Sequence, residues 1–107
     1  MKGLHDKIYT IEEIKKIVAP IARQHGVDRL YLFGSYARGE ATDASDLDFC
    51  VYAPALRGLF ALGGLYADLE TAFAKKLDLV TMKSLQHNSD RRFVSNLEKE
   101  RVLVYAG

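Results

Sequence analysis

Two acidic residues that alternate with apolar ones, in the run Asp46-Leu47-Asp48-Phe49, constrain the fold of this chain more than any other feature. Successive side chains of a β-strand point to opposite faces of a sheet, so Asp46 and Asp48 share one face, opposite Leu47 and Phe49. Two neighbouring carboxylates repel each other and are costly to bury. The run therefore predicts a strand with one side on a core and an acidic side open to solvent or to a cation.

Short elements are expected on both sides of this strand. Thr10 and Glu13 have capping-box spacing and lead into an apolar stripe, so a helix should begin at Thr10 and stop near Gly26, with a kink or a shifted end at Pro20. The other expected elements are a strand at 29–33, a turn and short helix at 34–39, a loop at 40–45, a strand at 46–52, a helical segment from 54 to about 76, a strand at 77–82, a helix at about 90–100 with a cap at Ser84 or Ser89, and a last strand or extended tail at 102–105.

This order of elements predicts an α/β (α+β) fold, a short mixed sheet flanked by helices, with residues 1–107 forming a single domain. Hydrophobic residues make up 49% of the chain, which is enough for a core. The formal net charge of +1 gives no support for strong, direct binding to nucleic acid. The lone Cys50 lies in an apolar run and is expected to be buried. No segment is expected to span a membrane, and a cytoplasmic location is the default expectation.

Two further features suggest chemistry at the ends of the strands. Gly34-Ser35 follows a strand and precedes a short helix, where free N–H groups and a hydroxyl can hold phosphate. An ordinary capped turn explains the dipeptide equally well. Asp78 interrupts an apolar strand and is expected opposite Leu77, either beside Asp46 and Asp48 or in a salt bridge, for example with Lys76. Three carboxylates on one face would suit a pair of Mg²⁺ ions that neutralise a phosphoryl group during transfer.

The spaced runs Phe33–Glu40, Ser45–Asp48 and Leu77–Val80 resemble the minimal nucleotidyltransferase (MNT) family, within the DNA polymerase β-like nucleotidyltransferase superfamily. The resemblance extends from about residue 11 to residue 105. It implies that Gly34 and Ser35 lie beside the phosphates of ATP, that Asp46, Asp48 and Asp78 bind two Mg²⁺ ions and are catalytic, and that Asp78 is the base-like group beside the acceptor hydroxyl. Arg38 matches the arginine of the motif, as a phosphate contact or as a clamp on the acidic loop.

The resemblance also implies a partner and an activity. Members of this size are commonly encoded beside HEPN-domain proteins, and the pair acts as a toxin–antitoxin system in which some members transfer AMP from ATP to a tyrosine of the HEPN toxin. Two alternatives stay open: an antitoxin that neutralises its partner by binding alone, and a transferase that acts on RNA or on a small molecule. Assembly as a homo- or hetero-oligomer is compatible with each of them.

The remaining features are expected to be structural. His5, His25 and His87 show no metal-ligand spacing. The aromatic residues at 60, 66 and 73 have near-helical spacing, which favours core packing or a partner surface. The basic residues Arg91, Arg92, Lys99 and Arg101 are expected on a solvated helix face, although they could also steer an acidic partner or a triphosphate.

Overall fold

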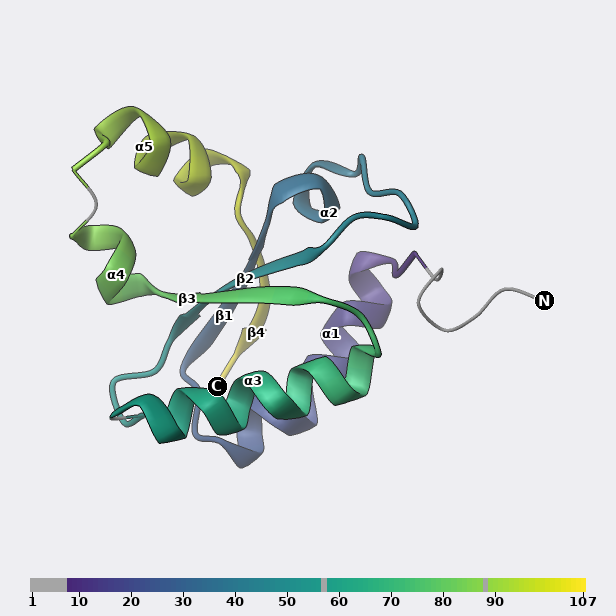
Figure 1. Cartoon of the computed structure of the whole chain (residues 1–107), viewed down its shortest axis with the longest axis vertical. Helices are drawn as coiled ribbons and strands as arrows, with labels where there is room; N and C mark the ends of the chain where they lie inside the picture. The colour runs from purple at the N-terminus through teal and green to yellow at the C-terminus, as the bar shows by residue number, and fades with distance from the viewer. Residues whose placement is uncertain (1–7, 57, 88) are drawn as a thin grey trace.

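The computed structural model describes residues 8–56, 58–87 and 89–107, which form helices and strands around one sheet (Figure 1). The elements are α1 (Ile11–Gln24), β1 (Arg29–Phe33), α2 (Gly34–Arg38), β2 (Leu47–Tyr52), α3 (Gly58–Phe73), β3 (Leu77–Thr81), α4 (Met82–Gln86), α5 (Arg91–Glu100) and β4 (Val102–Ala106). The predicted fold class, a short mixed sheet flanked by helices, is confirmed.

The strands lie in the order β3-β2-β1-β4, with β2 and β3 parallel and the other two pairs antiparallel. The C-terminal segment is therefore an edge strand beside β1 rather than a loose tail. Because β3 lies beside β2 in parallel register, Asp48 is directly opposite Asp78. On the other side of β2, Phe33 is opposite Asp48, so the end of β1 and its following turn lie next to the acids.

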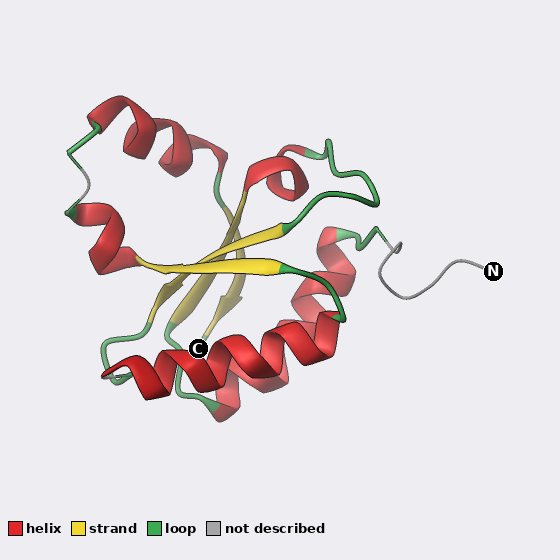
Figure 2. Cartoon of the chain, viewed as in Figure 1, coloured by secondary structure: helices red, strands yellow, loops and turns green. Residues whose placement is uncertain are grey.

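Helices α1 and α3 cover one face of the sheet, below it in Figure 2, and α4 and α5 lie on the opposite side. The main core lies between the sheet and the helices α1 and α3. Its fully buried members come from both helices and from three strands: Ile14, Val18, Leu30, Leu32, Leu47, Phe49, Val51, Leu65, Leu69, Phe73 and Leu77. The second face holds a small cluster of Tyr31, Phe33 and Cys50, against which Met82, Leu85 and Leu97 pack.

Helix α1 begins as predicted. The Thr10 hydroxyl accepts a hydrogen bond from the Glu13 N–H at 3.1 Å, and the Glu13 carboxylate accepts one from the Thr10 N–H at 3.0 Å. The helix passes through Pro20 and ends at Gln24, and Gly26 follows with a positive φ of 72°. The glycine thus lies just beyond the helix, where a left-handed residue reverses the chain.

The structure corrects several expected boundaries and helix caps. Strand β2 begins at Leu47, so Asp46 precedes the strand instead of opening it. Helix α3 spans only Gly58–Phe73, because Ala74 adopts a left-handed conformation with φ 51° and ends it before residue 76. Residue 82 opens α4, a helix that the sequence reading missed. Neither Ser84 nor Ser89 is a helix cap: the Thr81 side chain caps α4 and the Asp90 side chain caps α5.

Two other expectations concern the whole chain. Cys50 is fully buried, and burial raises the pKa of its thiol to about 11, so it is unreactive near neutral pH. None of the helices in the described segments has the length and apolar character needed to cross a membrane.

Candidate active site

Four of the six predicted site residues line one cavity of about 670 Å³ on the face of the sheet that carries α5. They are Gly34, Arg38, Asp48 and Asp78, which come from the end of β1, from α2, from β2 and from β3. Ser35 and Asp46 are not part of its lining. Ser35 is half-buried in the first turn of α2, and Asp46 is exposed at the end of the preceding loop.

The central feature of the cavity is the pair Asp48 and Asp78. Burial, the charge of Asp78, a hydrogen bond with its side chain and the charge of Asp46 together raise the pKa of Asp48 to about 6, with only a small opposing effect from Arg38. The alternative of a salt bridge for Asp78 is not realised, because none of the described lysines and arginines lies within 4.0 Å of its carboxylate. The two carboxylates therefore lie side by side without a salt-bridge partner among the described residues.

This donor set fits a hard divalent cation. Mg²⁺ is held by one or two carboxylates together with substrate phosphates, rather than by a complete protein cage. Among the described residues, no group of three or more His, Cys, Asp or Glu side chains could hold a metal ion, so the structure brings together two of the three predicted acids rather than all three. Asp48 and Asp78 supply adjacent oxygens, and Asp46 is near enough for its charge to act on Asp48. The participation of Asp46 as a ligand stays a prediction.

Gly34 is required by the geometry of this pair. Its φ of 72° lies in the left-handed region, and a Cβ atom at this position would collide with the Asp48 carboxylate. Any other residue would therefore push Asp48 away from its place. The predicted sharp turn at this glycine is confirmed; its close approach to a ligand stays a prediction, and the group that it approaches here is the Asp48 carboxylate.

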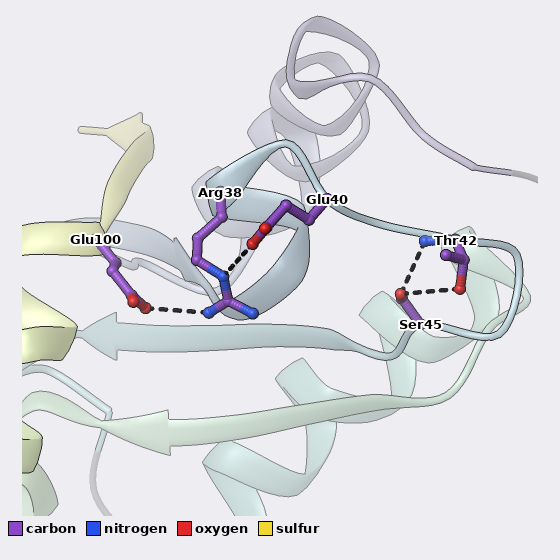
Figure 3. Close-up of polar contacts among 5 residues, drawn as sticks. All are labelled: Arg38, Glu40, Thr42, Ser45 and Glu100. Atoms are coloured by element: carbon purple, nitrogen blue, oxygen red, sulfur yellow. Dashed lines mark hydrogen bonds and ion pairs between the residues drawn. The ribbon is translucent and has the colours of Figure 1, made fainter.

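The loop before β2 is held by local hydrogen bonds. The Ser45 hydroxyl accepts from the Thr42 N–H at 2.9 Å (Figure 3). The Thr42 carbonyl accepts from the Ser45 N–H at 3.0 Å. The buried Lys75 ammonium group donates to the Asp43 carbonyl at 2.8 Å and ties the loop to the start of β3. These contacts fix the chain immediately before Asp46.

Arg38 is held between two carboxylates at the mouth of the cavity. Its Nε donates to Glu40 Oε1 at 2.7 Å, and its Nη1 donates to Glu100 Oε2 at 3.3 Å (Figure 3). The Glu40 contact agrees with the predicted clamp on the acidic loop. Sequence reading missed Glu100, because 62 residues separate it from Arg38 and no local pattern links them. The alternative role of Arg38 as a phosphate contact stays a prediction.

The remaining sequence expectations divide between core and surface. His25 Nε2 forms a hydrogen bond of 2.7 Å with Asp68 Oδ2 and links the end of α1 to α3, and His87 is the C-cap of α4. His5 lies outside the described residues. Phe73 is fully buried in the core, whereas Phe60, in the first turn of α3, is 98% exposed.

Residues 3–104 of this chain match the family described as nucleotidyltransferase domain. A Methanocaldococcus jannaschii protein assigned as a protein adenylyltransferase is 40% identical over 75 residues, which is 70% of this chain and 81% of that protein. The protein adenylyltransferase MntA of Thermococcus cleftensis is 35% identical over 81 residues, which is 72% of this chain and 82% of that protein.

Solved structures show the same fold. One described as a minimal nucleotidyltransferase aligns with a TM-score of 0.69 and 28% identity, over 88% of this chain and 95% of that one. A chain in the complex of tri-AMPylated Shewanella oneidensis HEPN toxin with MNT antitoxin aligns with a TM-score of 0.63 and 19% identity, over 92% of this chain and 74% of that one.

Proposed function

This chain belongs to the nucleotidyltransferase domain family and is a nucleotidyltransferase, and we propose that it transfers AMP from ATP to a tyrosine hydroxyl of a partner HEPN toxin and thereby acts as its antitoxin. The observation that carries the proposal is the pair Asp48 and Asp78, uncompensated and side by side in one cavity with Gly34 and Arg38. The relatives named protein adenylyltransferase and the complex of the tri-AMPylated toxin support the choice of AMP and of a protein acceptor.

Each of the six predicted site residues has a part in this reaction. Gly34 and Ser35 hold the phosphates of ATP at the start of α2, and Arg38 contacts them from its second turn. Two Mg²⁺ ions, held by Asp46, Asp48 and Asp78, would supply charge neutralisation for the triphosphate and the acceptor oxygen. Positioning and charge then account for most of the catalysis, because phosphoryl-type transfer asks little covalent chemistry of the protein.

The chemical step is a single displacement. The acceptor oxygen forms a bond to the α-phosphorus of ATP, and the bond from that phosphorus to the bridging oxygen breaks. Pyrophosphate leaves with the electron pair, and the proton of the hydroxyl passes to the carboxylate of Asp78. Asp78 suits this role because its side chain is exposed on the edge strand β3, whereas Asp48 is half-buried beside it on β2.

The test uses the protein with its HEPN partner and ATP labelled at the α-phosphate. Label on the toxin is expected with Mg²⁺ and wild-type protein, and a loss of at least 100-fold is expected for Asp48→Asn. Asp43→Asn is the matched control, because it removes the same charge from an exposed loop residue near the site. Equal labelling by the Asp48→Asn protein would overturn the proposal.

A second measurement separates catalysis from neutralisation by binding. If the Asp48→Asn protein still forms the complex but no longer protects cells from the toxin, transfer is the antitoxin activity. Full protection by this variant would instead favour a non-catalytic antitoxin. Label on RNA in the absence of the toxin would favour a nucleic-acid acceptor.

A further inference from the structure

A second cavity lies on the same face of the sheet, farther along β1 and β2. Its volume is about 1000 Å³, it is open to solvent, and its lining comes mainly from these two strands, from α4 and from α5. Phe33 and Leu85 line both this cavity and the catalytic one, so these two side chains stand between them. The residues at its far end, Arg29 and Tyr52, pair across the strands four positions beyond Phe33 and Asp48, which is about 14 Å at 3.4 Å per residue.

Three guanidinium groups line this cavity, from Arg29, Arg91 and Arg101. Glu98 is the one carboxylate among the described lining residues. Across the described segments, no carboxylate lies within 4.0 Å of any of the three arginines. The cavity therefore carries an excess of positive charge, with three guanidinium groups against the single carboxylate of Glu98.

Two of these arginines are held in place by tyrosine rings. Arg29 donates to the Tyr31 hydroxyl at 3.4 Å, and its guanidinium carbon lies 5.4 Å from the centre of the Tyr52 ring. The guanidinium carbon of Arg101 lies 4.6 Å from the centre of the Tyr31 ring. Tyr31 itself is 7% exposed, so it is a fixed support that brings two like charges to one place. A bound anion would remove their mutual repulsion.

The rest of the lining selects the class of anion. A guanidinium group presents paired N–H donors that match two oxygens of a phosphate. Apolar side chains of Phe33, Met82, Leu85 and Val94 complete the walls, and the half-exposed Tyr52 adds a ring edge. An acidic peptide would use the guanidinium groups but has no need of the apolar walls. A nucleotide would use the guanidinium groups for its phosphates and the apolar walls for its flat base. A volume of this size also suits a nucleotide.

We infer that this cavity is a second nucleotide-binding site, in which Arg29 and Arg101 hold the phosphates of a mononucleotide without the help of a metal ion. It goes beyond the proposed transfer reaction, because it uses none of the acids of the catalytic cavity. The two sites carry opposite charge. The acidic catalytic cavity needs Mg²⁺ to accept a phosphate, and the basic cavity does not. A nucleotide can therefore occupy each site at the same time.

The test removes the first site and asks what binding is left. The Asp46→Asn/Asp48→Asn protein is titrated with ADP in excess EDTA by calorimetry. Saturable binding at one site is expected, and Arg29→Gln/Arg101→Gln in the same background should weaken it at least tenfold. Arg92→Gln/Lys99→Gln is the matched control, because it removes the same charge from exposed positions of α5 outside the cavity, and it should change affinity less than twofold.

Two results of this titration would contradict the second nucleotide site without affecting the proposed transfer reaction. Absence of saturable ADP binding in EDTA, or equal binding by the arginine variant and its control, would overturn it, whatever the labelling experiment shows for the catalytic acids. Pyrophosphate that binds as tightly as ADP would show that the base contributes nothing, and this would overturn the nucleotide class. Thermal unfolding of each variant checks that it is folded, and the single substitutions Arg29→Gln and Arg101→Gln should each give part of the loss.

Discussion

The two faces of the sheet carry different kinds of side chain: one is almost wholly apolar, and the other gathers charged groups. The face under α1 and α3 consists of buried apolar side chains, with Phe73 packed edge-on to Tyr9 at 5.0 Å and tilted against Phe49 at 5.8 Å. The face toward α4 and α5 carries only a small apolar cluster, with two carboxylates in one cavity and arginines in the other.

The difference shows what each face is for. On the first face every close neighbour lowers the free energy of the folded chain through burial. On the second face like charges gather without compensation, which opposes folding and favours ligands of opposite charge. Substitutions should therefore divide the two faces: those on the first face should lower stability, and some of those on the second should raise it while they abolish function.

Phe73→Ala should give the largest effect. The ring is fully buried, so its loss leaves a cavity between α3, β2 and the chain before α1 and should cost about 3–5 kcal/mol in the free energy of unfolding. Urea unfolding followed by circular dichroism measures it. Phe93→Ala is the matched control on the other face, where the side chain is 47% exposed, and it should cost less than about 1 kcal/mol. Equal losses would show that α5 is as much a part of the core as α3.

Gly34→Ala should come next, because it combines two effects. A left-handed backbone costs an alanine roughly 1–2 kcal/mol, and the added methyl group must also displace the Asp48 carboxylate. Mg²⁺-dependent ATP binding should fall at least tenfold. Gly39→Ala separates the two effects, since it has a φ of 75° but open space around the new atom. It should lose similar backbone stability and keep ATP binding.

Asp48→Asn should stabilise the metal-free protein. The pKa of Asp48 is about 6 in the folded chain against 3.8 for a free side chain, so the folded state binds more protons between these values and stability falls as pH rises from about 4 to 6. The asparagine variant lacks this fall and should be more stable by about 1–2 kcal/mol at pH 7, after allowance for solvent screening. Thermal unfolding in EDTA across this pH range measures it, and an unchanged pH profile would count against a strained pair.

The local parts of this architecture could be predicted from sequence, because they depend on neighbours along the chain. The capping box at Thr10, the alternation around Asp48 and the fixed turn at Gly34 each rest on contacts within a few residues or on a strand period. Asp78 lies beside Asp48 only because β3 pairs in parallel with β2. The sequence left this pairing open, as one of two placements for Asp78.

The parts that could not be predicted depend on contacts between distant segments. Nothing periodic indicates that β4 pairs with β1, or that α4 exists, since it is one short helix capped by Thr81. The basic residues of α5 are exposed, as expected, but nothing in the sequence indicates that Arg91 lines the same cavity as Arg29 on β1. Asp46 was placed inside a strand because alternation alone does not show where pairing begins.

Glu100→Gln should have the smallest effect and should act on binding rather than on stability. An exposed ion pair contributes little to folding, so the melting temperature should scarcely change. Glu100 does, however, place a negative charge in the catalytic cavity and holds one side of Arg38, so its removal should tighten Mg²⁺-dependent ATP binding by about two- to fivefold at low salt and less at high salt. Glu98→Gln is the matched control, because Glu98 lines the other cavity and should leave this affinity unchanged. Weaker ATP binding by the Glu100 variant would instead assign Glu100 the task of orienting Arg38 for the phosphates, and α5 would then support the catalytic site as well as cover it.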